Sequence, residues 1–77
     1  MNLRELQSGE AGVISAVSIG GALGLRIREM GLVPGTEIIV VGRAPLYDPV
    51  KLRINGQTLT LRNNEADYIE INRVEGA

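Results

Sequence analysis

The stretch that decides the fold reads Val-Lys-Leu-Arg-Ile-Asn-Gly-Gln-Thr-Leu-Thr-Leu, residues 50–61. Apolar and polar side chains alternate on both sides of Asn55-Gly56, a dipeptide that strongly favours a two-residue β-hairpin turn. The turn predicts the strand register Ile54–Gln57, Arg53–Thr58, Leu52–Leu59, Lys51–Thr60 and Val50–Leu61. In this register Leu52, Val50 and their partners face inward, while the polar pairs face solvent.

Three more segments outside the hairpin predict strands, at residues 12–17, 36–43 and 68–72. The second contains Ile-Ile-Val-Val and is expected to be the central strand, covered on both faces. Residues 3–6 are expected to form one helical turn that plugs an end of the core, and residues 63–67 a turn. Five short strands predict a mainly β fold, a small curled antiparallel barrel, because closure protects strand edges.

One short α-helix is expected after the first strand, because Leu23, Ile27 and Met30 fall on one helical face. Gly31 fits the left-handed position that ends a helix, and Pro34-Gly35 suits the turn that follows. We expect the junction from Met30 to Gly35 to have a structural role, because its glycines and proline provide the backbone conformations that a helix end and a turn require.

Length and composition restrict the function. The 77 residues predict a single domain over 1–77, with a core over about 3–72 and a frayed end over 73–77. The chain has no cysteine and no histidine, which removes thiolate sites and the commonest general base. No export signal or membrane span is recognisable, so a cytoplasmic protein is expected. The formal charge of -1 gives no electrostatic reason for nucleic-acid or membrane binding.

The loop from residue 44 to 49 is the first candidate binding edge. Pro45 and Pro49 restrict it around Leu46 and Tyr47, so little entropy is lost if these apolar side chains contact a partner. The alternative, of equal weight, is that both side chains fold back over the barrel end.

The helix supplies the second candidate surface. Leu25 lies far from the inward stripe and is expected to be exposed unless adjoining tight loops bury it, which is the favoured alternative in so small a protein. Arg26 and Arg62 are further candidates for contact with a partner. Local ion pairs with Glu29 and Glu65, three residues further on in each case, also explain these two arginines.

Three motifs identify the chain as similar to a known family. Residues 26–35 read Arg-Ile-Arg-Glu-Met-Gly-Leu-Val-Pro-Gly, residues 44–50 read Ala-Pro-Leu-Tyr-Asp-Pro-Val, and residues 61–66 read Leu-Arg-Asn-Asn-Glu-Ala. Their order and spacing resemble those of FeoA proteins, although Ile27 replaces the commoner leucine and Tyr47 a common glycine. The resemblance covers about residues 3–71 and implies an SH3-like barrel.

The resemblance also implies a function. FeoA proteins are small partners of the ferrous-iron transporter FeoB, so it implies a non-enzymatic module that docks on the cytoplasmic GTPase region of such a transporter and modulates Fe(II) uptake. A place at the inner face of the membrane would follow from that partner, and self-association stays open. An arginine finger acting on the partner's GTPase is disfavoured for Arg26, Arg28, Arg43 and Arg62.

Metal and cofactor sites are not predicted. Transition-metal binding is associated with the family, yet Glu65, Asp67 and Glu70, the close carboxylate cluster, are expected to form a solvated face. No catalytic residue, metal ligand or cofactor is assigned.

Two other function classes stay as alternatives. A nucleic-acid-binding barrel would use the outward Lys51, Arg53 and Arg62, but that face lacks the aromatic side chains on which bases stack. The regulatory C-terminal domain of a DtxR-like metal-dependent repressor has a similar barrel, but a chain starting at Met1 with no helix-turn-helix before the barrel disfavours it.

Overall fold

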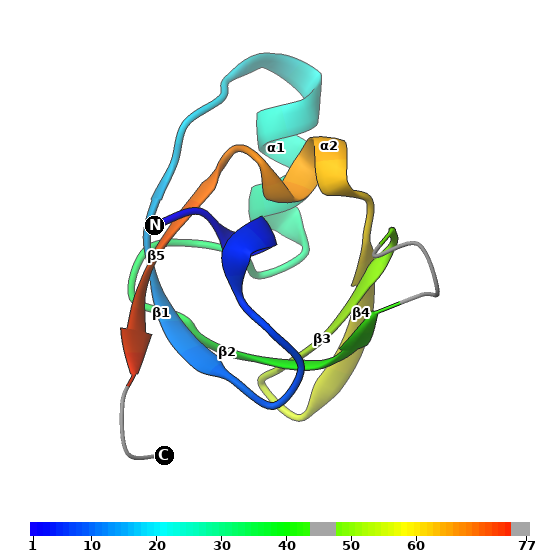
Figure 1. Ribbon diagram of the computed structural model, residues 1–77. Coiled ribbons are helices and arrows are strands. Elements are labelled where there is room, and N and C mark those ends of the chain that lie inside the picture. The colour runs from blue at the N-terminus through cyan, green and yellow to red at the C-terminus, as the bar shows by residue number, and fades with distance from the viewer. Residues whose placement is uncertain (44–47, 75–77) are drawn as a thin grey trace.

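The chain forms one curled sheet with short helices at its ends. The computed structural model describes residues 1–43 and 48–74. Its elements are η1 (Leu3–Glu5), β1 (Ala11–Val17), α1 (Gly21–Glu29), β2 (Glu37–Arg43), β3 (Val50–Ile54), β4 (Gln57–Leu61), α2 (Asn63–Ala66) and β5 (Ile69–Val74). The strands pair antiparallel in the order β4-β3-β2-β1-β5 and curl around a common core (Figure 1). The predicted five-stranded architecture, with a helix after the first strand, is confirmed.

The β3–β4 hairpin has the register that its sequence predicts at all five pairs, from Val50–Leu61 to Ile54–Gln57. Asn55 and Gly56 have φ angles of 47° and 78°, the left-handed values that a two-residue turn of this type requires. The register follows from local chemistry, because a slip of one residue would turn every apolar side chain outward.

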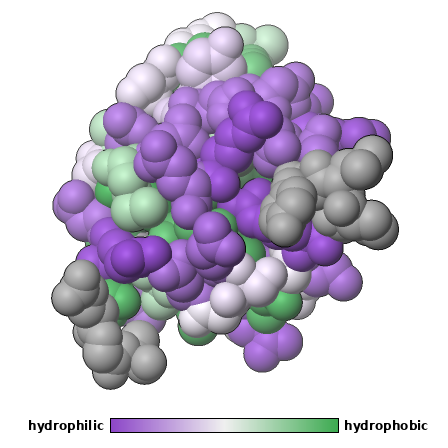
Figure 2. Space-filling view, in the orientation of Figure 1, coloured by the Kyte–Doolittle hydropathy of each residue, from purple (hydrophilic) through white to green (hydrophobic). Residues whose placement is uncertain are grey.

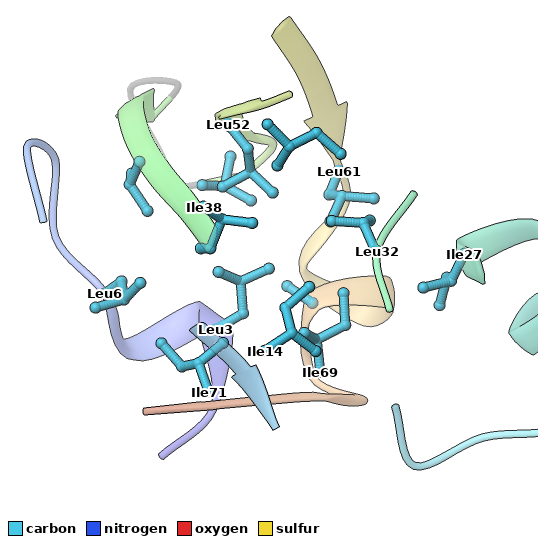
Figure 3. Close-up of a cluster of buried hydrophobic side chains, with 14 residues drawn as sticks. Leu3, Leu6, Ile14, Ile27, Leu32, Ile38, Leu52, Leu61, Ile69 and Ile71 are labelled. Carbon is cyan, nitrogen blue, oxygen red and sulfur yellow. The ribbon is translucent and has the colours of Figure 1, made fainter. Parts of the chain in front are cut away.

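The core lies inside the curled sheet. Leu3 and Leu6 of the N-terminal turn are buried, as predicted for a plug. The side chain of Asn2 accepts a hydrogen bond from the Arg4 amide at 2.8 Å, which caps η1. Figure 3 shows these leucines packed among buried side chains of all five strands, namely Ile14, Ile38, Leu52, Leu61, Ile69 and Ile71.

Strand β2 is central, as predicted, but only one of its faces is covered. Ile38 and Val40 are buried, whereas Ile39 is 38% exposed and Val41 is 45% exposed. The prediction of two covered faces is therefore wrong. A run of four β-branched residues hides the alternation, because in an antiparallel sheet the outer face can stay solvated.

Helix α1 contributes Ile27 to the core, with Leu23 and Met30 packed against it, as the predicted stripe requires. The chain then leaves the helix through Gly31, whose φ is 95°, and Leu32 turns back into the core. The predicted left-handed helix end is confirmed.

Gly31→Ala is expected to lower the free energy of unfolding by about 1–2 kcal/mol, because a side chain makes the left-handed backbone unfavourable. The added methyl would meet the Ile54 Cδ1 atom at 3.4 Å and the Asn55 Nδ2 atom at 3.7 Å, both ordinary contacts, so strain in the backbone dominates. Urea unfolding followed by circular dichroism measures the change. Gly42→Ala, which has open space and no such φ, is the control, and an equal effect of the two substitutions would contradict this account.

The C-terminal part differs from expectation in two details. Residues 63–66 form a single α-helical turn, α2, which the sequence indicated only as a turn. Strand β5 begins at Ile69 and continues to Val74, beyond the expected end of the core at residue 72, because Arg73 and Val74 pair with β1. The rest of the tail expected to fray lies outside the described residues.

Candidate partner-binding surface

The exposed side of α1 carries Leu25, one of the predicted partner contacts. Leu25 is 58% exposed, the largest value among the exposed large apolar side chains of the described residues. Burial by the adjoining loops, the favoured alternative, is therefore wrong: the loop before α1 packs against the helix at Gly24 and Arg28 and leaves Leu25 exposed. In Figure 1, α1 and α2 lie together at one end of the barrel.

Two features attach the loop before α1 to the helix. The guanidinium of Arg28 donates hydrogen bonds to the carbonyl oxygens of Val17 and Ile19, at 3.1 and 3.0 Å. Gly24 is buried, and a Cβ atom built on it would lie only 2.2 Å from the Ile19 carbonyl oxygen. Glycine is a poor helix former, but at this position its lack of a side chain permits the close contact.

Arg26 joins α1 to α2. Its Nη2 atom lies 2.7 Å from Oε2 of Glu65, 39 residues away, and not next to Glu29. The predicted local pair with Glu29 is wrong, because the start of α2 packs beside the helix and presents a less solvated carboxylate. Glu65 is only 7% exposed and does not belong to a solvated acidic face.

Glu65 is thus the residue that sequence reasoning missed. Its second oxygen accepts the backbone N–H of Arg62 at 3.1 Å, which caps the first turn of α2. The three-residue spacing after Arg62 was a usable signal for a capping glutamate. The cross-chain partner Arg26 was not visible in the sequence.

Arg62 itself is exposed. Its guanidinium has no hydrogen bond or ion pair with any residue in 1–43 or 48–74, so the predicted side-chain pair with Glu65 does not form. Arg43, by contrast, donates to the carbonyl oxygens of Arg4 and Leu6, which ties β2 to the N-terminal turn. Arg62 is therefore free to contact a partner.

The proline-restricted loop is only partly described. Pro45, Leu46 and Tyr47 lie outside the described residues, so their predicted roles stay predictions. Asp48 at the loop's end accepts the backbone N–H of Asn63 at 2.9 Å. This contact places the end of the loop at the start of α2, next to Arg62.

Pro49 lines an open groove of about 350 Å³ on the outer face of the sheet. Its other lining residues are Val41, Gly42, Arg43, Lys51 and Thr60. Figure 2 shows one face of the molecule, on which hydrophilic residues predominate and apolar areas are small and separate.

The α1–α2 surface offers three groups that a partner could contact: the exposed side chain of Leu25, the guanidinium of Arg26 held by Glu65, and the exposed guanidinium of Arg62. Within the described ranges, no three His, Cys, Asp or Glu side chains are grouped so that they could hold a metal ion. None of the described helices is long and apolar enough to span a bilayer.

Comparison with known proteins gives consistent matches. A family model described as the FeoA domain matches residues 1–73. A curated relative from Porphyromonas gingivalis, an Fe(2+) transport protein A/Fe(2+) transporter FeoB fusion protein, is 45% identical over 71 residues. These make up 92% of this chain but only 8% of that protein.

Solved structures agree with the family match. Iron(II) transport protein A from Clostridium thermocellum is 41% identical, with a TM-score of 0.94 over 99% of this chain and 47% of that one. FeoA of Stenotrophomonas maltophilia, described as an SH3 domain protein in complex with zinc, is 28% identical with a TM-score of 0.82, over 94% of this chain and 89% of that one. The predicted SH3-like fold is confirmed.

A manganese-dependent transcriptional repressor also contains this fold, with a TM-score of 0.87 over 36% of its chain, but the identity of 17% shows a shared fold alone. Matches in sequence, over nearly the whole length, are to FeoA proteins. This chain therefore belongs to the FeoA family.

Proposed function

We propose that this protein is a non-enzymatic module that docks on the cytoplasmic GTPase region of an FeoB-like transporter and modulates ferrous-iron uptake. The observation that carries the proposal is the fusion of a 45% identical domain to FeoB in a single chain of the relative. Joining two domains in one chain holds them at a high effective concentration, as is expected for domains that act together. The protein would then work on the cytoplasmic side of the membrane.

The surface of α1 and α2 is suited to this docking. Leu25 projects into solvent beside Arg26, whose guanidinium is held by Glu65 and so is ordered before a partner arrives. Ordered groups lose less entropy on binding, and an aliphatic side chain beside a guanidinium is a common interface combination. Arg62 extends the same surface, and Leu46 and Tyr47 are proposed to extend it further.

Leu25→Ala is expected to weaken binding to the transporter about tenfold, because a leucine buried at an interface contributes more than about 1 kcal/mol. Titration of the purified protein against the full transporter in lipid nanodiscs, and against its isolated GTPase domain with and without a GTP analogue, measures the change. Folding stability should be preserved, since alanine at this exposed helical position is favourable.

Val33→Ala is the matched control, since Val33 is an exposed aliphatic residue outside α1. It should leave the affinity unchanged. Equal weakening by both variants would show that the contact is nonspecific, and unchanged affinity of Leu25→Ala would exclude α1 as the docking surface. Absence of binding to the full transporter in every nucleotide state would contradict the proposed function itself.

A further inference from the structure

The two edge strands of the sheet, β5 and β4, differ in what hydrogen-bonds to their outer side. At the β5 edge, the Met1 carbonyl accepts the Ile71 amide at 2.7 Å, the Met1 amino group donates to the Ile71 carbonyl, and Asn2 forms a bridge with Glu70. At the other edge, β3 is the one strand of residues 1–43 and 48–74 that pairs with β4. Figure 1 shows β4 and β5 on opposite sides of the barrel.

The backbone of β4 presents unused hydrogen-bonding groups along that edge. In a hairpin closed by a two-residue turn, the pair next to the turn exchanges both hydrogen bonds and the next pair exchanges none. Ile54–Gln57 is the pair next to the turn, so the amides and carbonyls of Thr58 and Thr60 point away from β3. Neither residue hydrogen-bonds elsewhere within the described ranges, and both are exposed.

Nothing in β4 blocks the pairing of another strand. Protected edges usually carry a lysine, a proline or a bulge, whereas Gln57–Leu61 has none of these and pairs with β3 without a register shift. On the inner face, Leu59 is only partly buried and packs at the margin of the core. A further strand would cover it with an apolar side chain.

The outer face beside this edge is basic. Arg62 follows β4 on the same side as Thr58 and Thr60, and Lys51 and Arg53 lie opposite those threonines on β3. All three cations are exposed, and none forms an ion pair with the described residues. Two carboxylates near these cations do not pair with them within the described residues: Glu37 lies two residues before Ile39, the β2 partner of Arg53, and forms no ion pair, and Asp48 accepts the Asn63 amide.

We propose that the β4 edge binds an extended segment of a partner protein as a sixth strand, with apolar and acidic side chains in alternation. The backbone of Thr58 and Thr60 pairs with the segment, its apolar side chains cover Leu59, and its acidic side chains face Lys51, Arg53 and Arg62. Side chains alternate between the two faces of a strand, so one segment satisfies both faces only with this pattern. This site adjoins the α1–α2 surface at Arg62, which both proposals use, but its backbone contacts lie on β4.

A second copy of the chain fits this edge poorly. Two β4 strands paired with each other would supply no carboxylate, because β4 contains none, and would bring two basic faces together. Charge complementarity therefore favours an acidic partner segment over self-association.

The test uses soluble peptides and the intact chain. The probe contains three Val-Glu repeats flanked by Gly-Ser, and the matched control peptide contains Val-Lys repeats. Amide NMR titration of the labelled protein should show changes centred on β4 with the acidic peptide, and hydrogen exchange of the Thr58 and Thr60 amides should slow at least tenfold. The basic peptide should bind at least tenfold more weakly.

Two variants keep the test specific. Thr60→Pro removes one outward amide at an edge position that tolerates proline, so the fold should persist while peptide affinity falls at least tenfold. The double variant Lys51→Glu/Arg53→Glu should prefer the basic peptide. Equal binding of both peptides, changes located away from β4, no shift at about 1 mM peptide, or Thr58 and Thr60 protected by dimerisation without peptide would each overturn the proposal.

Discussion

Gly24→Ala is expected to lower the free energy of unfolding by about 3 kcal/mol or more, a large part of the stability of a domain this small. The new Cβ would lie 2.2 Å from the Ile19 carbonyl oxygen and 2.6 Å from an Arg28 guanidinium nitrogen. The first neighbour is backbone, so relief requires the loop before α1 to move away from the helix. Alanine favours helix formation by up to about 1 kcal/mol, which offsets only part of this cost.

Thermal unfolding followed by circular dichroism measures the effect, and the midpoint should fall by about 12 °C or more. Gly20→Ala is the matched control, since Gly20 lies in the same loop and no atom comes within 4 Å of its added Cβ. If Gly24→Ala were as mild as the control, the loop would not be in close contact with α1. Displacement of the loop should also break the hydrogen bonds of Arg28 to Val17 and Ile19, so an Arg28→Ala change should add little in the double variant.

The sequence predicts those parts of the fold that depend on neighbouring residues. Asn55-Gly56 needs only its own backbone preferences to form the turn, and the alternation on each side then sets the register of β3 with β4. The helix end at Gly31 is equally local, because a glycine there relieves a backbone conformation that other residues resist.

Other parts depend on which segments meet in three dimensions, and the sequence does not contain that information in a readable form. Gly24 is a poor helix residue by propensity, yet it is required by the carbonyl of Ile19 that approaches it. Glu65 has a nearby arginine in the sequence, but its guanidinium partner comes from α1. The exposure of Ile39 depends on the absence of a layer outside β2 in the described structure, which composition alone does not indicate.

The candidate binding surfaces also include residues that the sequence predicts and a feature that it does not. Leu25 and Arg26 could be selected because helical periodicity places Leu25 off the core stripe, and the structure then shows that it is exposed. The sequence shows the outward cations Lys51, Arg53 and Arg62 but does not predict a binding site at the edge of β4, because an edge is defined by which strands pair and not by any residue in it.

Glu65→Ala is expected to lower the free energy of unfolding by about 2–3 kcal/mol, because one side chain makes two contacts. The substitution removes the carboxylate that pairs with Arg26 and also the acceptor of the Arg62 amide. The side chain of Arg26 is two-thirds exposed, so water can hydrate its guanidinium once the carboxylate is removed. The ion pair itself therefore contributes only part of the loss in stability. Urea unfolding of the purified variant measures the change.

A double-mutant cycle separates the two contacts. Glu65→Gln keeps a side-chain oxygen that can accept the Arg62 amide but removes the charge, so combining it with Arg26→Ala isolates the ion pair. The coupling energy is expected to be about 0.5–1.5 kcal/mol and to decrease in 1 M salt, since a partly exposed pair is screened. Additive effects would show that Arg26 and Glu65 do not interact. A measurable coupling would establish that residues 39 positions apart hold α1 against α2, which is the arrangement that exposes Leu25.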